Sequence, residues 1–92
     1  MTLFDIIRHA QVFLNTGSKY VVIARGQTDD LGPGSQAYQI RLHREGPYIL
    51  CDARGWLGEQ WSDWRDRRGW LGSAGFDIDD VLATDWRILS ES

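Results

Sequence analysis

The segment "AYQIRLHREGPYILCD" (37–52) decides the fold class, because it is the clearest β-hairpin pattern in the chain. In its first half apolar and polar side chains alternate, as in a strand with one covered face and one exposed face. The apolar row is Tyr38, Ile40 and Leu42, and the polar row is Gln39, Arg41 and His43. "REGP" (44–47) predicts the turn and "YILCD" (48–52) the returning strand. We expect the polar row to be an ordinary solvent-facing surface, with a ligand-binding role as the alternative.

An amphipathic helix and a strand are expected before this hairpin. Apolar residues recur at helical spacing over 3–14, and Thr2 followed by Asp5 resembles a capping box. Gly17 is the expected left-handed residue that ends the helix. "YVVIAR" (20–25) is rich in β-branched residues and predicts a strand.

The remaining segments complete an α+β expectation. The Gly-, Asp- and Pro-rich stretch 26–36 predicts a loop, and the spacing of apolar residues predicts a helix over about 57–67. A short helix is expected over 78–83, with Asp77 as its N-cap and its buried side formed by Ile78, Val81 and Leu82, and a strand over 85–89. We therefore predict one small α+β domain over 1–92: an N-terminal helix and a mostly antiparallel sheet of about four strands, with one or two further short helices.

Composition excludes several classes of function. The formal charge of −3 argues against direct binding of nucleic acid, which needs a basic surface. No apolar run is long enough to span a membrane, and the N-terminus lacks the basic region of a signal peptide, so we expect a cytoplasmic protein. The single cysteine, Cys51, rules out an internal disulfide, and His9 and His43 lack metal-ligand spacing, so no cofactor or metal is expected. A core this small would gain from association, which favours a homo-oligomer, a dimer or a tetramer.

Motifs of catalysis are missing from the sequence. It contains no Walker-type phosphate loop, no GxGxxG and no GxSxG. Asp77, Asp79 and Asp80 could hold a divalent cation, but acids at a helix N-terminus explain them more simply. We therefore expect a binding protein and not an enzyme.

Tryptophan and arginine are both abundant. Five tryptophans occur in 92 residues, and nine of the ten Lys and Arg side chains are arginines. Aromatic rings beside guanidinium groups can stack on a planar base while holding its phosphates. The same residues also suit the centre of a protein–protein interface. The sequence leaves these two interpretations open.

Both ends of the chain resemble a known family of phage proteins. Trp70 and Ser73, followed by "DVLATDW" (80–86), are similar to the C-terminal signature of the second type of Thoeris anti-defence protein. The N-terminal helix, Gly17, Lys19 and a strand that ends at Arg25 are similar to the front of that family. The chain departs from the family where Gly26 is followed by Gln27 and not by tryptophan, and residues 30–68 carry none of the resemblance.

The resemblance implies a sponge, which binds a cyclic nucleotide immune signal and holds it without cleavage. A cyclic ADP-ribose isomer or a cyclic dinucleotide would be the signal, bound in pockets between the subunits of a homo-oligomer. Mapped onto this chain, the resemblance and the arginine–aromatic argument nominate six ligand-binding residues: Arg25, Arg68, Trp70, Ser73, Asp85 and Trp86. For two of them a structural role is the alternative, Asp85 as the cap of a backbone turn and Trp86 as part of the core.

A small inhibitor of the anti-CRISPR type is the second expectation. Such a protein would bind a host defence protein complex and block its nucleic-acid-binding surface by offering carboxylates to basic side chains. The candidate decoy acids are Asp29, Asp30, Asp77, Asp79 and Asp80. A structural or regulatory phage protein is the third possibility.

Overall fold

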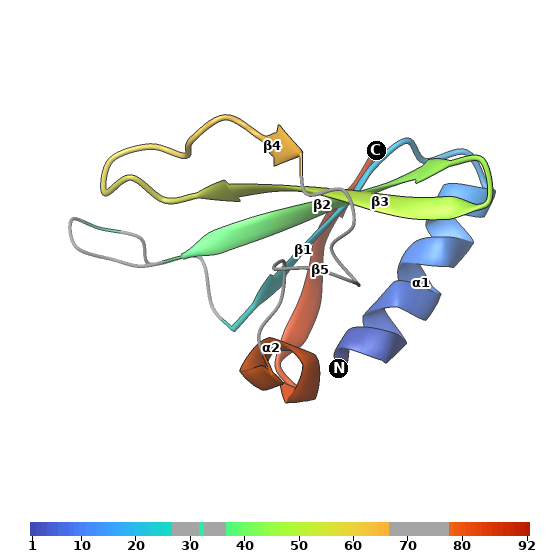
Figure 1. The fold of residues 1–92 in the computed structure, drawn as a ribbon, viewed down its shortest axis with the longest axis horizontal. Helices are drawn as coiled ribbons and strands as arrows, with labels where there is room; N and C mark the ends of the chain where they lie inside the picture. The colour runs from blue at the N-terminus through green and yellow to red at the C-terminus, as the bar shows by residue number, and fades with distance from the viewer. Residues whose placement is uncertain (27–31, 33–36, 67–77) are drawn as a thin grey trace.

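The computed structural model describes residues 1–26, 32, 37–66 and 78–92, and it confirms the α+β class. Five antiparallel strands form one sheet in the order β4-β3-β2-β1-β5 (Figure 1). The elements along the chain are α1 (Leu3–Asn15), β1 (Val21–Arg25), β2 (Tyr38–Glu45), β3 (Tyr48–Gly55), the two-residue β4 (Arg65–Asp66), α2 (Ile78–Leu82) and β5 (Trp86–Glu91).

Local sequence explains where α1 begins and ends. The Thr2 hydroxyl accepts a hydrogen bond from the Asp5 N–H at 3.2 Å, which is the predicted N-cap. At the other end the Phe13 carbonyl accepts from the N–H groups of Thr16 and Ser18. Gly17 follows with a φ of +116°, a conformation that residues with a Cβ rarely adopt. The helix therefore ends at the residue that the sequence indicates.

The predicted hairpin is formed by β2 and β3, which pair from Tyr38↔Gly55 to Glu45↔Tyr48. Gly46, with a φ of +60°, makes the turn between them. Alternation along the strands places one row of side chains toward α1 and the next row toward the other side of the sheet. The sheet thus has a face covered by α1, and an outer face opposite to it.

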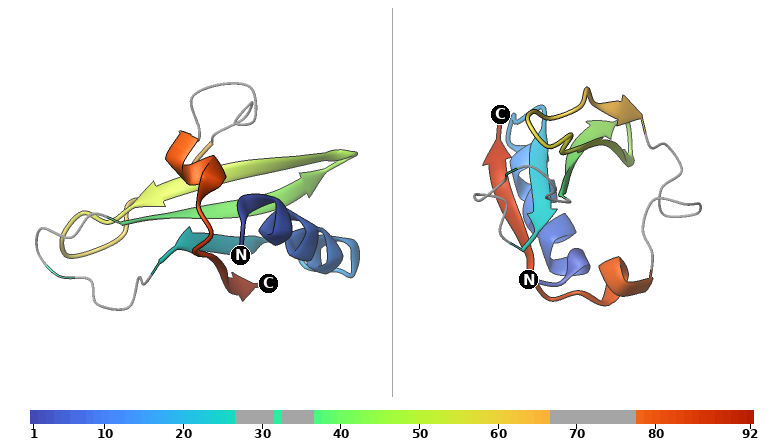
Figure 2. Two further views of the ribbon diagram at one scale, coloured as in Figure 1. Left: turned by 90° about the horizontal axis from the view of Figure 1, so that it is seen from below. Right: turned by 90° about the vertical axis from the view of Figure 1, so that its left-hand side faces the viewer.

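The hydrophobic core lies between α1 and the sheet, whose strands curl around the helix (Figure 2). Its buried side chains come from α1, from the inner rows of the strands, and from the start of β5: Leu3, Ile6, Ala10, Leu14, Val21, Ile23, Ile40, Leu42, Cys51, Ala53 and Trp86. Trp86 is 1% exposed and is the largest of the fully buried side chains. Its indole N–H donates to the Asp80 carbonyl at 2.8 Å, so its polar atom is satisfied.

Two expectations about secondary elements are wrong. The helix expected over 57–67 is not formed in its described part, residues 57–66, where Trp56 instead bridges Trp61 and Arg65–Asp66 joins β3 as β4. Gly58 has a φ of +93°, which no α-helix contains. The short helix α2 does form, but the side predicted to be buried is not: Ile78 is 75% exposed and Leu82 72% exposed. Residue Asp77 and most of the 26–36 stretch lie outside the described residues.

The polar row of β2 is not an ordinary solvent-facing surface either. Gln39 is 8% exposed, and Arg41 and His43 are half-buried. Tyr20 and Trp64 contribute rings that contact Arg41 on this outer face. The second side of the sheet is therefore partly covered by aromatic side chains.

Candidate functional site

A stack of alternating aromatic rings and guanidinium groups crosses the outer face of the sheet. We call it the ladder, and its members in order are Tyr20, Arg41, Trp64, Arg54, Trp61 and Trp56. The guanidinium carbon of Arg41 lies 4.4 Å from the Tyr20 ring centroid and 4.8 Å from that of Trp64. That of Arg54 lies 4.5 Å from Trp64 and 5.1 Å from Trp61. These are cation–π distances.

Strand alternation places the two arginines of the ladder on one face. Arg41 in β2 pairs with Asp52, and Arg54 in β3 pairs with Gln39, so all four side chains belong to the outer rows. Trp61 and Trp64, from the segment that returns along β3, then contact these guanidinium groups. The ladder thus holds that segment against a sheet face that has no helix on it within the described part of the chain.

The two arginines differ in their countercharge. Arg41 donates to Asp52 Oδ2 from Nε and Nη2, at 3.0 and 2.6 Å, which makes a closely bonded ion pair. Arg54 donates to the neutral Gln39 Oε1 at 2.8 Å, and no described carboxylate lies within 4 Å of its guanidinium. Burial, and then repulsion by Arg41, hold the pKa of Arg54 below its ordinary value. Arg54 is therefore a charged group that an anion would stabilise.

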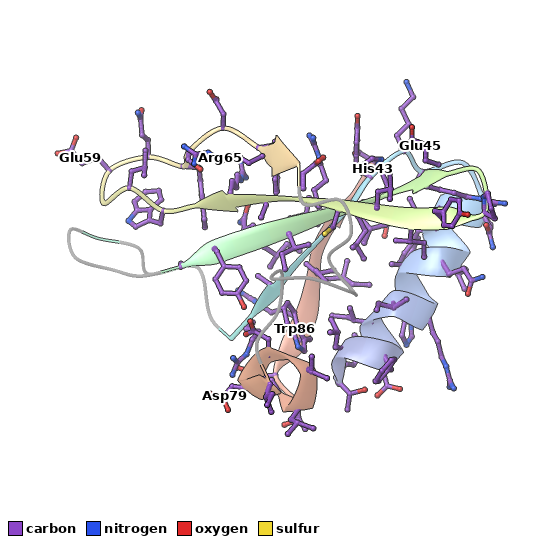
Figure 3. All side chains as sticks on the ribbon, viewed as in Figure 1. His43, Glu45, Glu59, Arg65, Asp79 and Trp86 are labelled. Atoms are coloured by element: carbon purple, nitrogen blue, oxygen red, sulfur yellow. The ribbon has the colours of Figure 1, made fainter. Side chains whose placement is uncertain are left out.

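A groove of about 440 Å³ opens beside Arg54. This volume falls within the range of about 300–1,000 Å³ that is typical of small-ligand sites. Arg65 in β4 also lines it, and the other lining residues are Tyr38, Ala53, Gly55, Leu57 and Ser62. Because Arg65 pairs with Ala53, its side chain belongs to the same face of the sheet as Tyr38. Figure 3 shows Arg65 and Glu59 on the segment that runs along β3. The groove thus combines the Arg65 guanidinium with the Tyr38 ring and the Ser62 hydroxyl group, whereas the Arg54 guanidinium lies on the outer face among the rings of the ladder.

Ser62 fixes one wall of this groove. Its hydroxyl accepts a hydrogen bond from the Gly55 N–H at 3.0 Å and donates to the Asp63 carbonyl at 3.1 Å. The Ser62 N–H in turn donates to the Gly55 carbonyl at 2.8 Å. These bonds join the end of β3 to the returning segment, so the groove is built on paired backbone and not on a free loop.

A separate cluster surrounds Arg25 at the end of β1. Its Nη1 donates to Asp80 Oδ1 and its Nε to Asp85 Oδ1, both at 3.0 Å, and the Tyr38 hydroxyl donates to the same Asp80 oxygen at 2.7 Å. These hydrogen bonds hold the pKa of Arg25 above its ordinary value. The hydrogen bond from Arg25 in turn holds the pKa of Asp85 below its ordinary value. An anion at Arg25 would have to compete with two carboxylates.

The structure brings together only part of the predicted ligand-binding set. Arg25 and Asp85 are hydrogen-bonded to each other. Trp86 lies in the core between α1 and α2 (Figure 3), so of its two expected roles, ligand binding and core packing, the structure supports core packing. Arg68, Trp70 and Ser73 lie outside the described residues.

The sequence did not lead us to expect this groove. Arg54 and Arg65 carry no local motif, and the helix expected over 57–67 would have placed Arg65 on a different face. The available signal was the three-residue spacing of Trp61 and Trp64 next to a strand with a polar outer row.

The described residues give no indication of a metal site or of a membrane-spanning helix. No three His, Cys, Asp or Glu side chains there are grouped so that they could hold a metal ion. Neither described helix is long and apolar enough to cross a membrane. Comparisons with family models, with curated proteins and with solved structures found no match to the chain.

Proposed function

We propose that this protein sequesters a cyclic nucleotide signal, a cyclic ADP-ribose isomer or a cyclic dinucleotide, in the groove lined by Arg65 and Tyr38. The observation that carries the proposal is a groove of nucleotide size lined by Arg65, whose guanidinium has no carboxylate within 4 Å among the described residues. A guanidinium without a countercharge among the described residues offers a position for a phosphate.

The groove offers one contact for each part of a nucleotide. The Arg65 guanidinium suits a phosphate, because its fork geometry matches phosphate oxygens. The ring of Tyr38, which is 36% exposed and lines the groove, suits a stacked base. The resemblance of both chain ends to a family of signal-binding phage proteins supports the same class of ligand. Arg68, Trp70 and Ser73 stay candidates for this site, because they follow Arg65 closely in the chain.

We propose capture without cleavage. Tyr38, Arg54, Ser62 and Arg65 are the polar residues that line the groove. Arginine stays protonated and cannot act as a base, and the Ser62 hydroxyl donates to a backbone carbonyl, which does not activate it as a nucleophile. The signal would therefore be held and released intact.

Sequestration also needs tight binding, which an open groove on one subunit does not favour. A second copy that covers the groove would exclude water and strengthen each phosphate contact. A homo-oligomer in the bacterial cytoplasm, where such signals act, is therefore part of the proposal. Of the candidate decoy acids that the structure describes, Asp80 is bound to Arg25 and Tyr38, which leaves the exposed Asp79 as the described acid available to a protein partner.

Isothermal titration calorimetry with a panel of cyclic ADP-ribose isomers and cyclic dinucleotides tests the proposal. We expect one of them to bind the wild type, and the Arg65→Ala variant to lose about tenfold or more in affinity, the loss that corresponds to a charge-assisted hydrogen bond. Arg8→Ala is the matched control, because Arg8 is exposed on α1 away from the groove. Absence of binding across the panel, or equal affinity of the wild type and Arg65→Ala, would contradict the proposal.

A further inference from the structure

A second basic hollow lies at the opposite end of the hairpin from the groove. The pairing of β1 with β2 ends at Val21↔Leu42, whereas β2 continues to Glu45. The connection from α1 crosses the space that this leaves beside β2. The resulting hollow has a volume of about 580 Å³. Figure 3 labels His43 and Glu45 at this end, near the C-terminal end of α1.

Basic residues dominate the lining of this hollow. Lys19, His43 and Arg44 all contribute, together with Ser18 and the ring of Tyr20. Arg44 is held in place by two neutral acceptors, the Gly46 carbonyl at 2.9 Å and Asn15 Oδ1 at 2.6 Å. Neither Lys19 nor Arg44 has a carboxylate within 4 Å among the residues that the structure describes.

The negative groups near the hollow are already bonded. Asp52 lies 3.7 Å from His43 Nε2, but its Oδ2 accepts both hydrogen bonds from Arg41. The Phe13 carbonyl at the end of α1 accepts from Thr16 and Ser18, which reduces the unfavourable effect of the helix dipole on an anion. A Ser92 oxygen accepts from the backbone N–H groups of Lys19 and Tyr20. Among the described residues that line the hollow, the charged side chains of Lys19 and Arg44 are positive, and no carboxylate lines it.

We propose that this hollow is a second anion site, which binds the phosphate group of a small phosphate ester through Lys19 and Arg44. Arg44 is pre-organised by its two neutral acceptors, so its guanidinium loses little freedom when the phosphate binds. Ser18 adds a hydroxyl donor at the rim, and Tyr20 adds an aromatic ring beside it. The site shares no lining residue with the groove of Arg65 and Tyr38, and it does not depend on the function proposed for that groove.

Nuclear magnetic resonance tests this site directly. Amide shifts of the ¹⁵N-labelled protein are followed while inorganic phosphate replaces chloride at constant ionic strength. We expect saturable shifts at residues 18–20 and 43–46, and a loss of affinity of about three- to fivefold in Lys19→Gln, the upper range for an exposed ion pair. Arg8→Gln is the control for a lost exposed charge, and Arg65→Ala is the control for the groove; both should bind phosphate as the wild type does.

Adenosine monophosphate as a second titrant identifies the source of the phosphate. Tighter binding than inorganic phosphate would assign the hollow to a nucleotide, and equal binding would assign it to free phosphate or to a phosphate group alone. Phosphate shifts that do not saturate at these residues, or that are the same in Lys19→Gln as in the wild type, would overturn the proposal. Loss of the shifts in Arg65→Ala would overturn it as well, because the phosphate would then occupy the groove.

Discussion

Replacing Trp64 by leucine tests whether the ladder stabilises the outer face of the sheet. The Trp64 ring lies between two guanidinium groups, at 4.8 Å from that of Arg41 and 4.5 Å from that of Arg54. One such contact contributes about 0.5–1 kcal/mol when exposed and about 2 kcal/mol when desolvated. Because Trp64 is half-buried, the two contacts together should contribute about 2–3 kcal/mol.

Urea denaturation at a fixed protein concentration measures this loss, since self-association would make stability depend on concentration. Leu57→Ala is the control in the same segment; Leu57 is 64% exposed, and its loss should cost less than about 0.5 kcal/mol. A double-mutant cycle of Trp64→Leu with Arg54→Met isolates one contact, with an expected coupling energy of about 1 kcal/mol. If Trp64→Leu costs no more than Leu57→Ala and the coupling is close to zero, the ladder does not hold the segment in place.

Three further predictions concern the core, the Arg25–Asp85 pair and the end of α1. Trp86→Ala should lower the free energy of unfolding by about 3–5 kcal/mol in urea denaturation, because it removes the largest sealed side chain of the core; an unchanged value would place Trp86 outside the core. The hydrogen bond from Arg25 lowers the pKa of Asp85, so the stability that this pair contributes is present above the ordinary pKa and is lost as the pH falls through the folded-state pKa. The wild type should therefore keep its advantage over Asp85→Asn in melting temperature down to about pH 5 and lose it as the pH falls through and below the ordinary pKa of about 3.9, and a constant difference would refute the pairing. Gly17→Ala should lower the free energy of unfolding by about 1–2 kcal/mol in urea denaturation, because a φ of +116° is strained for alanine even though its Cβ would meet nothing within 4 Å. An unchanged free energy of unfolding would mean that the end of α1 rearranges.

The fold could be predicted largely from local patterns. The alternation over 37–52 and the helical spacing over 3–14 each report one element with one covered face, and both elements form as expected. The conformation of residues 57–66 could not be predicted from their local pattern. Their apolar spacing fits a helix, but their conformation depends on contacts with guanidinium groups from β2 and β3. The exposure of Ile78 and Leu82 was missed for a related reason, since apolar spacing on a short helix does not say whether a partner surface is present.

The candidate site was harder to predict than the fold. Arg25 and Asp85 were nominated together and do meet, but the structure adds Asp80 as a second partner of Arg25. The environment of Arg54 was missed because it depends on how β2 and β3 pair, which places its guanidinium beside the neutral Gln39 and beside no carboxylate among the described residues. The sequence shows which side chains are available, and only the register of the strands shows which charges are left without a partner.

Recovery of the captured signal tests the central claim most directly. The protein is mixed with the signal that binds in calorimetry, the free signal is separated by ultrafiltration and quantified by liquid chromatography with mass spectrometry, and the retained fraction is then heat-denatured. We expect free signal to fall in proportion to added protein, and denaturation to return all of the bound signal chemically intact. Free signal that stays constant, or that disappears with the appearance of cleavage products, would contradict the proposal.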